Sequence, residues 1–459
     1  MRRFKSLHLA MLTLGSLCLN SAYASDTLHS LTDSEMSATT GQSLFTLQYL
    51  APSDTGNSYN STNGNIGFYK FGMEAELQLN ANIKKLQLGC GGVNGANACD
   101  IDIDNVSLSG LGNSSTSNTD SDADRAARVG SSAILNNPFM QLAIKNPDSA
   151  STRQLVGVNF SAESIQGLLT FGEENSSTKN GINSLSGYMV TAATKGESNV
   201  NGFGTSLVSG EAARGTLNQS DGYDPITGKV CCLLFGAGTL DFETESYALN
   251  LRDKATGSNI LKADLTLPEQ VITGKRITSA ALTANAKVRD IDLTGNIVAV
   301  AGGLITLDRE LTGTLQNLNV DVAINENLGF FHKANLNGTA ASLSVQSQKL
   351  QWPGNKSLAQ TGWWLELSNP IDIGYIKTSQ SVDIPKSTLN QTFGQVGSYL
   401  TDNPIFCGNN LASECLTGTT IASGNLNLIN ATRPQMTLTD LQLATQNFTP
   451  NCYGTLKFC

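Results

Sequence analysis

The chain alternates apolar and polar residues with a period of two in many separate segments. In residues 74–83 every odd position is apolar and every even position is polar. The same alternation runs through residues 282–289, 318–325 and 425–428. Successive side chains of a β-strand point to opposite faces, so each segment predicts a strand with one dry and one wet face. Together they predict an all-β fold of large antiparallel sheets, elongated in shape, with few short helices.

The alternation changes parity at two places. Ile101 and Ile103 are apolar at odd positions, whereas Val106 and Leu108 are apolar at even ones, so the switch falls at residues 104–105. A second switch falls at residues 289–290. Each switch predicts a bulge or a turn, and the pattern fits a kinked strand and a pair of strands equally well.

Composition divides the chain into three regions. We predict a signal peptide in residues 1–24, an N-terminal β region with polar loops in 25–267, and a more regular C-terminal β region in 268–459. The last region contains one segment with helical spacing, over about residues 386–401. Its apolar positions recur every three or four residues, at Leu389, Phe393, Val396 and Leu400.

The N-terminus has the three parts of an export signal. Arg2, Arg3 and Lys5 are basic, residues 7–19 are mainly apolar, and Ala22-Tyr23-Ala24 matches a cleavage site. We therefore expect a protein of the periplasm, the outer-membrane surface or an extracellular filament. After cleavage no segment is long and apolar enough to predict a membrane-spanning helix.

The cysteines support the same location. Of nine cysteines, Cys18 lies in the predicted signal peptide. Short-range pairs of cysteines in an exported chain indicate disulfides. The predicted pairs are Cys90 with Cys99, Cys407 with Cys415, and Cys452 with Cys459. The adjacent Cys231 and Cys232 could each reach a distant cysteine, but we favour a vicinal bond between them.

The charge balance argues against nucleic acid as a partner. The chain has 29 Lys+Arg and 38 Asp+Glu, a net charge of -9. Loss of Arg2, Arg3 and Lys5 with the signal peptide gives -9 - 3 = -12. A negative surface does not attract phosphate backbones or anionic lipids by its overall field.

Candidates for metal binding are weak. His29 and His332 are the histidines outside the signal peptide, and we expect both to be ordinary surface residues. Two runs of aspartates at every second position could chelate calcium, but neither has the glycine and glutamate of an EF-hand loop. The first run, Asp100, Asp102 and Asp104, is expected on one strand face. The second, Asp120, Asp122 and Asp124, is expected in a loop and is the better calcium candidate; no other cofactor is predicted.

The three tryptophans, Trp352, Trp363 and Trp364, lie in one short segment. Exposed, they could bind a glycan or a partner protein; more often such residues cover the apolar face of a sheet. Trp363 and Trp364 are adjacent, so on a strand they point to opposite faces and at most one enters a single core. The sequence contains no nucleophile elbow, HExxH motif or P-loop, and we expect no catalytic residues and no enzyme.

Four segments resemble blocks shared by a group of exported Gram-negative proteins, the FilA-like family of pilus assembly proteins. They are LTDSEMSATTGQ (31–42), NPF with AIKNPDSASTR (137–139 and 143–153), GINSLSGYM (181–189) and NCYGTLKFC (451–459). The resemblance implies a role in pilus assembly, with other pilus or cell-surface proteins as partners. It supplies no catalytic or binding residues. The chain lacks the apolar N-terminal helix of type IV pilins, which favours an accessory, tip or surface-associated role over a shaft subunit.

Three functions are therefore open. The first is an exported, non-enzymatic component of pilus or surface-filament assembly that acts through protein contacts. The alternative is a calcium-dependent adhesin or ligand-binding surface protein. The third is a periplasmic hydrolase whose carboxylates the sequence does not reveal.

Overall fold

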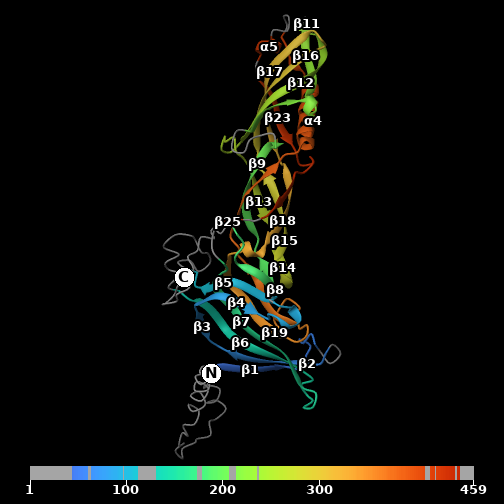
Figure 1. The fold of residues 1–459 in the computed structure, drawn as a ribbon. Coiled ribbons are helices and arrows are strands. Elements are labelled where there is room, and N and C mark those ends of the chain that lie inside the picture. The colour runs from blue at the N-terminus through green and yellow to red at the C-terminus, as the bar shows by residue number, and fades with distance from the viewer. Residues whose placement is uncertain are drawn as a thin grey trace, which may run out of the picture. The chain divides into compact units, whose positions relative to one another are not determined.

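The computed structural model describes residues 44–59, 64–96, 98–111, 131–172, 178–205, 213–234, 237–408, 414–418, 420–439 and 442–444. Contacts divide the chain into two units, Met1–Leu44 and Phe45–Cys459. All elements below belong to the second unit, and their labels are those of Figure 1. The predicted signal peptide, residues 1–24, lies outside the described residues, and the predicted elongated shape stays a prediction.

The first sheet has 11 strands and takes most of them from the N-terminal half of the unit. Its order is β1-β2-β6-β7-β19-β20-β8-β5-β4; β14 also pairs with β8, β3 with β6, and β5 with β7. The strands are β1 (Phe45–Leu50), β2 (Ile66–Met73), β3 (Glu76–Leu79), β4 (Ala81–Leu88), β5 (Ile101–Ser109), β6 (Ala133–Lys145), β7 (Gln154–Thr170), β8 (Ile182–Thr191), β14 (Gln270–Ile277), β19 (Lys333–Gln346) and β20 (Gly362–Ile371).

The other two sheets have seven strands each. The second sheet runs, in order, β24 (Gln435–Leu438), β18 (Asn319–Asn327), β15 (Ser279–Val288), β13 (Leu261–Leu267), β9 (Thr194–Thr205), β21 (Tyr375–Asp383) and β25 (Gln442–Ala444). The third runs β22 (Ile405–Phe406), β11 (Thr227–Leu234), β12 (Ala237–Asp253), β16 (Ile291–Ala301), β17 (Ile305–Gln316) and β23 (Ile421–Asn427), with β10 (Ala213–Asn218) also on β12.

The all-β prediction is confirmed, but the sheets are mixed rather than purely antiparallel. Parallel pairs join β8 to β20, β9 to β21, β17 to β23, β18 to β24 and β11 to β22. Four of these parallel pairs have a common cause: two separate runs of the chain leave one sheet and enter another in the same direction, so their strands lie parallel. The run β20–β21 follows β8–β9 from the first sheet into the second, and β23–β24 follows β17–β18 from the third into the second.

The predicted helix is present as α4 (Lys386–Asp402). It starts after Pro385, because a proline disfavours the helical conformation at the residue that precedes it. The helix buries the four predicted apolar residues. The described residues also form α5 (Glu414–Thr417) and the short 3₁₀ turns η1 (Gly92–Asn94), η2 (Gln219–Asp221) and η3 (Leu328–Phe330). Among the described helices, none combines the length and apolar character needed to cross a membrane.

A single apolar core connects the three sheets, and a smaller cluster lies against the first sheet. Strands on either side of Pro268 pair with one another, for example β13 with β15, β8 with β14, and β7 with β19. Residues 25–267 and 268–459 are therefore interleaved wherever the structure describes them, rather than folded side by side as separate sheets.

The two parity switches have different structural causes. At residues 104–105 the strand β5 continues through with Asn105 at φ 48°, and the buried positions stay odd, at Ile101, Ile103, Ser107 and Ser109, while Val106 and Leu108 are half-buried. At residues 289–290 the chain turns from β15 in the second sheet to β16 in the third. Asparagine tolerates a positive φ better than most residues, which explains how this position takes that conformation without a glycine.

Candidate functional site

Strand β1 forms one end of the first sheet. Within the part of the chain that the structure describes, it pairs only with β2. Its sequence, FTLQYL, contains no charge, proline or glycine. The side chain of Leu47 is 66% exposed and that of Tyr49 is 42% exposed. We call the outer side of Phe45–Leu50 the β1 edge.

The other described sheet edges are blunted in ways that discourage pairing with a second protein. Strands β3, β22, β24 and β25 have four residues or fewer. The longer edges carry charges or glycines: Lys84 and Lys85 on β4, Lys275 and Arg276 on β14, Arg214 on β10, and Gly424 on β23. The β1 edge has none of these devices, so it is the described edge best suited to accept a partner strand.

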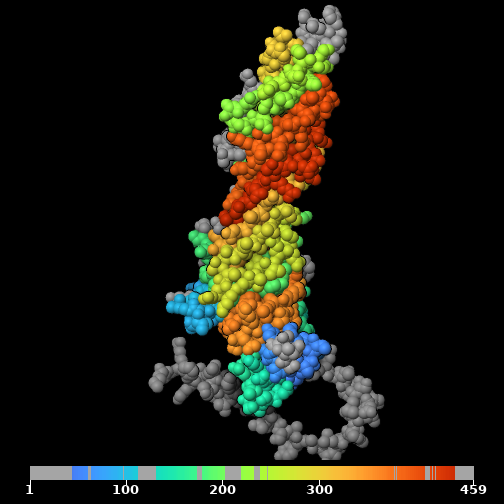
Figure 2. Space-filling model, turned by 90° about the vertical axis from the view of Figure 1, so that its right-hand side faces the viewer, coloured from blue at the N-terminus to red at the C-terminus, as the bar shows by residue number. Residues whose placement is uncertain are grey.

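A cavity of about 690 Å³ adjoins β1, and we call it the trough. Its floor includes Gln48, Lys70 and Gln141, which are cross-strand neighbours on β1, β2 and β6. Phe68, Phe139 and the turn at residues 353–355 contribute to its walls. In Figure 2 the blue N-terminal strands and the orange segment around residue 350 lie side by side, as these lining residues require.

An ion pair crosses the trough. Lys70 Nζ lies 3.1 Å from Glu163 Oε1 and 4.1 Å from the centre of the Phe139 ring. Asn137 donates a hydrogen bond of 2.9 Å to the other oxygen of Glu163. The bonds from Asn137 and Lys70 hold the pKa of Glu163 below its usual range. Glu163 is therefore ionised at neutral pH, and the pair places a donor and an acceptor side by side.

Gln141 is the most buried polar residue of the trough, with 3% exposure. Its Oε1 accepts a hydrogen bond of 2.9 Å from Asn159 Nδ2. Its amide nitrogen makes no hydrogen bond within the described residues. This nitrogen is not among the described side-chain atoms that are buried without a partner, so it is accessible from the trough, and a polar ligand there would accept the hydrogen bond that the protein does not supply.

The tryptophans pack inside the protein. Trp352 is fully buried and donates to Gln346, and Trp364 is buried and donates to Ser357. The partner-binding alternative is therefore wrong for Trp352 and Trp364, which cover the apolar face of a sheet instead, because residues 347–361 fold over the first sheet and bring Trp352 against Phe68. The prediction that Trp363 and Trp364 face opposite sides is confirmed: Trp363 is half-buried and contacts the main core.

A buried carboxylate holds this covering segment in place. Glu366 on β20 accepts hydrogen bonds from the backbone nitrogens of Lys356 and Ser357, and from the hydroxyls of Ser357 and Ser368. Four donors compensate the burial of its charge. The wall of the trough at residues 353–355 is thereby tied to the sheet that forms the floor.

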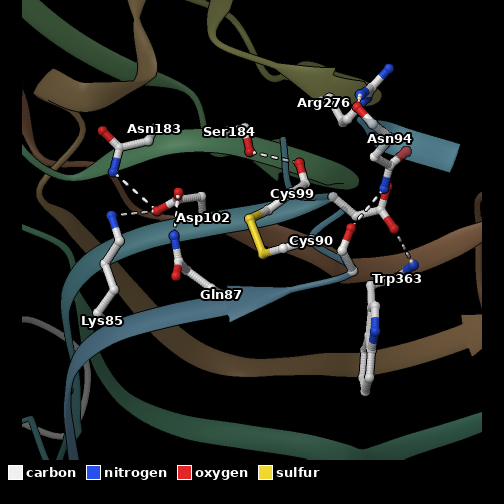
Figure 3. Close-up of a disulfide and its surroundings, with 12 residues drawn as sticks. Lys85, Gln87, Cys90, Asn94, Cys99, Asp102, Asn183, Ser184, Arg276 and Trp363 are labelled. Atoms are coloured by element: carbon white, nitrogen blue, oxygen red, sulfur yellow. Dashed lines mark hydrogen bonds and ion pairs between the residues drawn. A yellow bond between two sulfur atoms is a disulfide. The ribbon is translucent and has the colours of Figure 1, made fainter. Parts of the chain in front are cut away.

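The disulfide between Cys90 and Cys99 is present and closes the loop between β4 and β5 (Figure 3). Asp100 follows it, is buried, and accepts hydrogen bonds from Asn94 Nδ2 and the backbone nitrogen of Trp363, both 3.0 Å. The disulfide and Asp100 together fasten the loop to β20.

The aspartates of the first run bind protein groups. Lys85 Nζ lies 2.7 Å from Asp102, and Asn183 donates to the same carboxylate (Figure 3). Lys85 Nζ also lies 2.8 Å from Asp104, to which Asn183 donates as well. Although burial opposes it, the bonds to Asp102 lower the pKa of that carboxylate. No cluster of metal-ligating side chains occurs among the described residues. The second run, Asp120, Asp122 and Asp124, lies outside them, so its calcium hypothesis stays a prediction.

The remaining predicted cysteines fall into two groups. Cys407 and Cys415 form the second disulfide, beside α5. Cys452 and Cys459 lie outside the described residues, as does the side chain of Cys232. The vicinal bond between Cys231 and Cys232 therefore stays a prediction.

His332 is buried, with 4% exposure, so the expectation of a surface histidine is wrong for it. It follows η3 and begins the turn into β19, where Phe331 and Ala334 enter the core. Burial lowers its pKa, although its Nδ1 lies 2.8 Å from the carbonyl oxygen of Phe171. His29 lies outside the described residues.

Sequence reasoning missed both the β1 edge and the trough. The β1 edge had a readable signal, an alternating segment without charge, proline or glycine. The trough had none, because Lys70 and Glu163 are 93 residues apart and meet only through the register of β2, β6 and β7. No family model, curated protein or solved structure matches the chain.

Proposed function

We propose that this chain is an exported, non-enzymatic component of pilus or surface-filament assembly that joins a neighbouring subunit by strand pairing at the β1 edge. The observation that carries the proposal is the contrast between β1 and the other described edges. An open edge offers a row of backbone donors and acceptors to an extended segment, and its exposed side chains add apolar contact.

Two further features support the proposal. Four segments spread along the predicted mature chain resemble the FilA-like family. The disulfides Cys90–Cys99 and Cys407–Cys415 suit a protein that works in an oxidising compartment. The partner is expected to supply a strand with apolar residues at alternate positions, since Leu47 and Tyr49 project on one side of β1.

A charge placed on the β1 edge tests this role. In cells that carry the Leu47→Lys variant, the protein should no longer co-purify with filaments sheared from the surface, because an edge lysine opposes strand addition. Leu155→Lys is the matched control: Leu155 is 55% exposed on β7, which has partners on both sides. Equal recovery of both variants with filaments would refute pairing at β1. Unchanged filaments after deletion of the gene, seen by electron microscopy, would refute the assembly role.

The trough favours a second candidate, a ligand-binding surface protein. Its polar lining includes the Lys70–Glu163 ion pair and the amides of Gln48 and Gln141, which can hold a ligand without calcium. The trough shares Gln48 and Tyr49 with β1, but strand pairing uses the backbone of the β1 edge whereas a ligand contacts side chains of the floor, so the two candidates are tested separately.

A further inference from the structure

The trough has the size and shape of a small-molecule site. Its volume of about 690 Å³ lies within the range of about 300–1,000 Å³ that is typical of ligand pockets. The floor is a β-sheet and the opposite wall is fixed by Glu366, so the groups that would contact a ligand are already in place.

The charges in the trough exclude several ligand classes. Lys70 and Glu163 are paired at 3.1 Å, so an anionic ligand would be opposed by Glu163 and a cationic one by Lys70. A purely apolar ligand would leave the amide nitrogen of Gln141 buried without a partner. The occupant must be neutral and must carry hydrogen-bonding groups.

The walls add a second requirement. Phe68, Phe139 and Pro353 present apolar surface next to the polar floor. A ligand that fits both has an apolar face on one side and hydroxyl groups on the other. Each hydroxyl can accept from Lys70 or Gln141 and donate to Glu163 at once. Sugars combine these properties.

We propose that the trough binds a neutral saccharide, with hydroxyls on Lys70, Glu163 and Gln141 and its C–H face against the apolar wall at Pro353. The inference rests on the ligand-binding candidate and not on strand pairing at β1. A failed saccharide test leaves the assembly proposal standing, and a failed assembly test leaves this one standing.

Saturation-transfer NMR on the purified full chain tests the proposal. The probes are galactose, mannose, N-acetylglucosamine and lactose, with glucuronic acid as a charged probe. We expect at least one neutral probe to bind, and the Gln141→Glu and Lys70→Met variants to weaken it about tenfold, the effect of one lost hydrogen bond. Lys85→Met is the matched control, because Lys85 is also an ion-paired lysine but lies outside the trough.

Each result of the NMR experiment either supports or overturns the saccharide proposal. No transfer from any neutral probe at millimolar concentration overturns the proposal, as does equal binding by both trough variants and the control. Binding of glucuronic acid alone overturns the neutral class. Thermal unfolding confirms that each variant is folded, and if Gln141→Glu unfolds, Lys70→Met decides, because its side chain is partly exposed.

Discussion

Strands β15 and β1 both alternate apolar and polar residues, but the apolar side chains are buried in β15 and exposed in β1. In β15 every second residue from Ala280 to Val288 is apolar and buried, and each intervening one is exposed, over ten residues. In β1, Leu47 and Tyr49 alternate with Thr46 and Gln48 just as regularly, yet the apolar side chains stay exposed. The buried residues of β15 belong to the main core, whereas Leu47 and Tyr49 belong to no buried cluster, and within β1 Leu50 packs against the smaller one.

The difference between β15 and β1 shows that the alternating pattern predicts which side chains share a face but not whether that face is buried. Alternation fixes which side chains share a face, because it depends only on the geometry of a strand. Whether that face is covered depends on what the rest of the chain, or another protein, packs against it. An alternating strand that the described part of its own chain leaves uncovered is therefore a candidate interface.

The largest expected effect compares the two strands directly. Leu282→Ala in β15 should lower the free energy of unfolding by about 2–5 kcal/mol, because it leaves a cavity in the core. Leu47→Ala should change it by no more than about 0.5 kcal/mol, because its side chain already faces solvent. Urea unfolding of both variants measures the contrast. A comparable loss in both would mean that β1 is covered in the free protein.

The comparison also explains how far the sequence could predict the fold. The strands β15 and β18 and the helix α4 followed from local periodicity, which burial then enforced. The parallel pairs did not follow, because they depend on how often the chain passes between sheets. The segment at residues 74–83 was predicted as a single strand, but it is divided between β3 and β4, which pair with different neighbours.

The candidate site was harder to predict than the strands, because it depends on contacts between segments that are far apart in the sequence. Trp352 and Trp364 were visible as a cluster, but the sequence could not tell a covered face from an open one. The disulfides Cys90–Cys99 and Cys407–Cys415 were predictable because each closes a short loop. The trough combines residues from β1, β2, β6 and β7, and only the register of these strands brings them together.

The buried residue His332 makes the stability of the folded protein depend on pH. Because burial holds its pKa below the ordinary value, the folded protein keeps His332 neutral while the unfolded chain takes up a proton below about pH 6.5. Stability is therefore complete above that pH and falls as the pH drops through it, by at most about 1.4 kcal/mol per pH unit.

Urea unfolding between pH 7.5 and pH 5 measures this slope. The His332→Gln variant should lose it, and the His29→Gln variant should keep it. The carboxylates with lowered pKa, Asp102 and Glu163, contribute only at lower pH, as they approach their ordinary values near 4. A slope that survives in His332→Gln would show that another group titrates on unfolding.

The smallest effect on stability should accompany a clear change in association. Strand β4 ends the first sheet opposite β1 and differs from it by Lys84 and Lys85. Replacing both lysines by leucine removes the partly exposed ion pairs of Lys85, which costs no more than about 1 kcal/mol. It also makes β4 resemble β1, so sedimentation velocity should show association that increases with protein concentration. If the double variant stays as dispersed as the parent, charge is not what keeps this edge closed, and the absence of charge on β1 would no longer mark it as an interface.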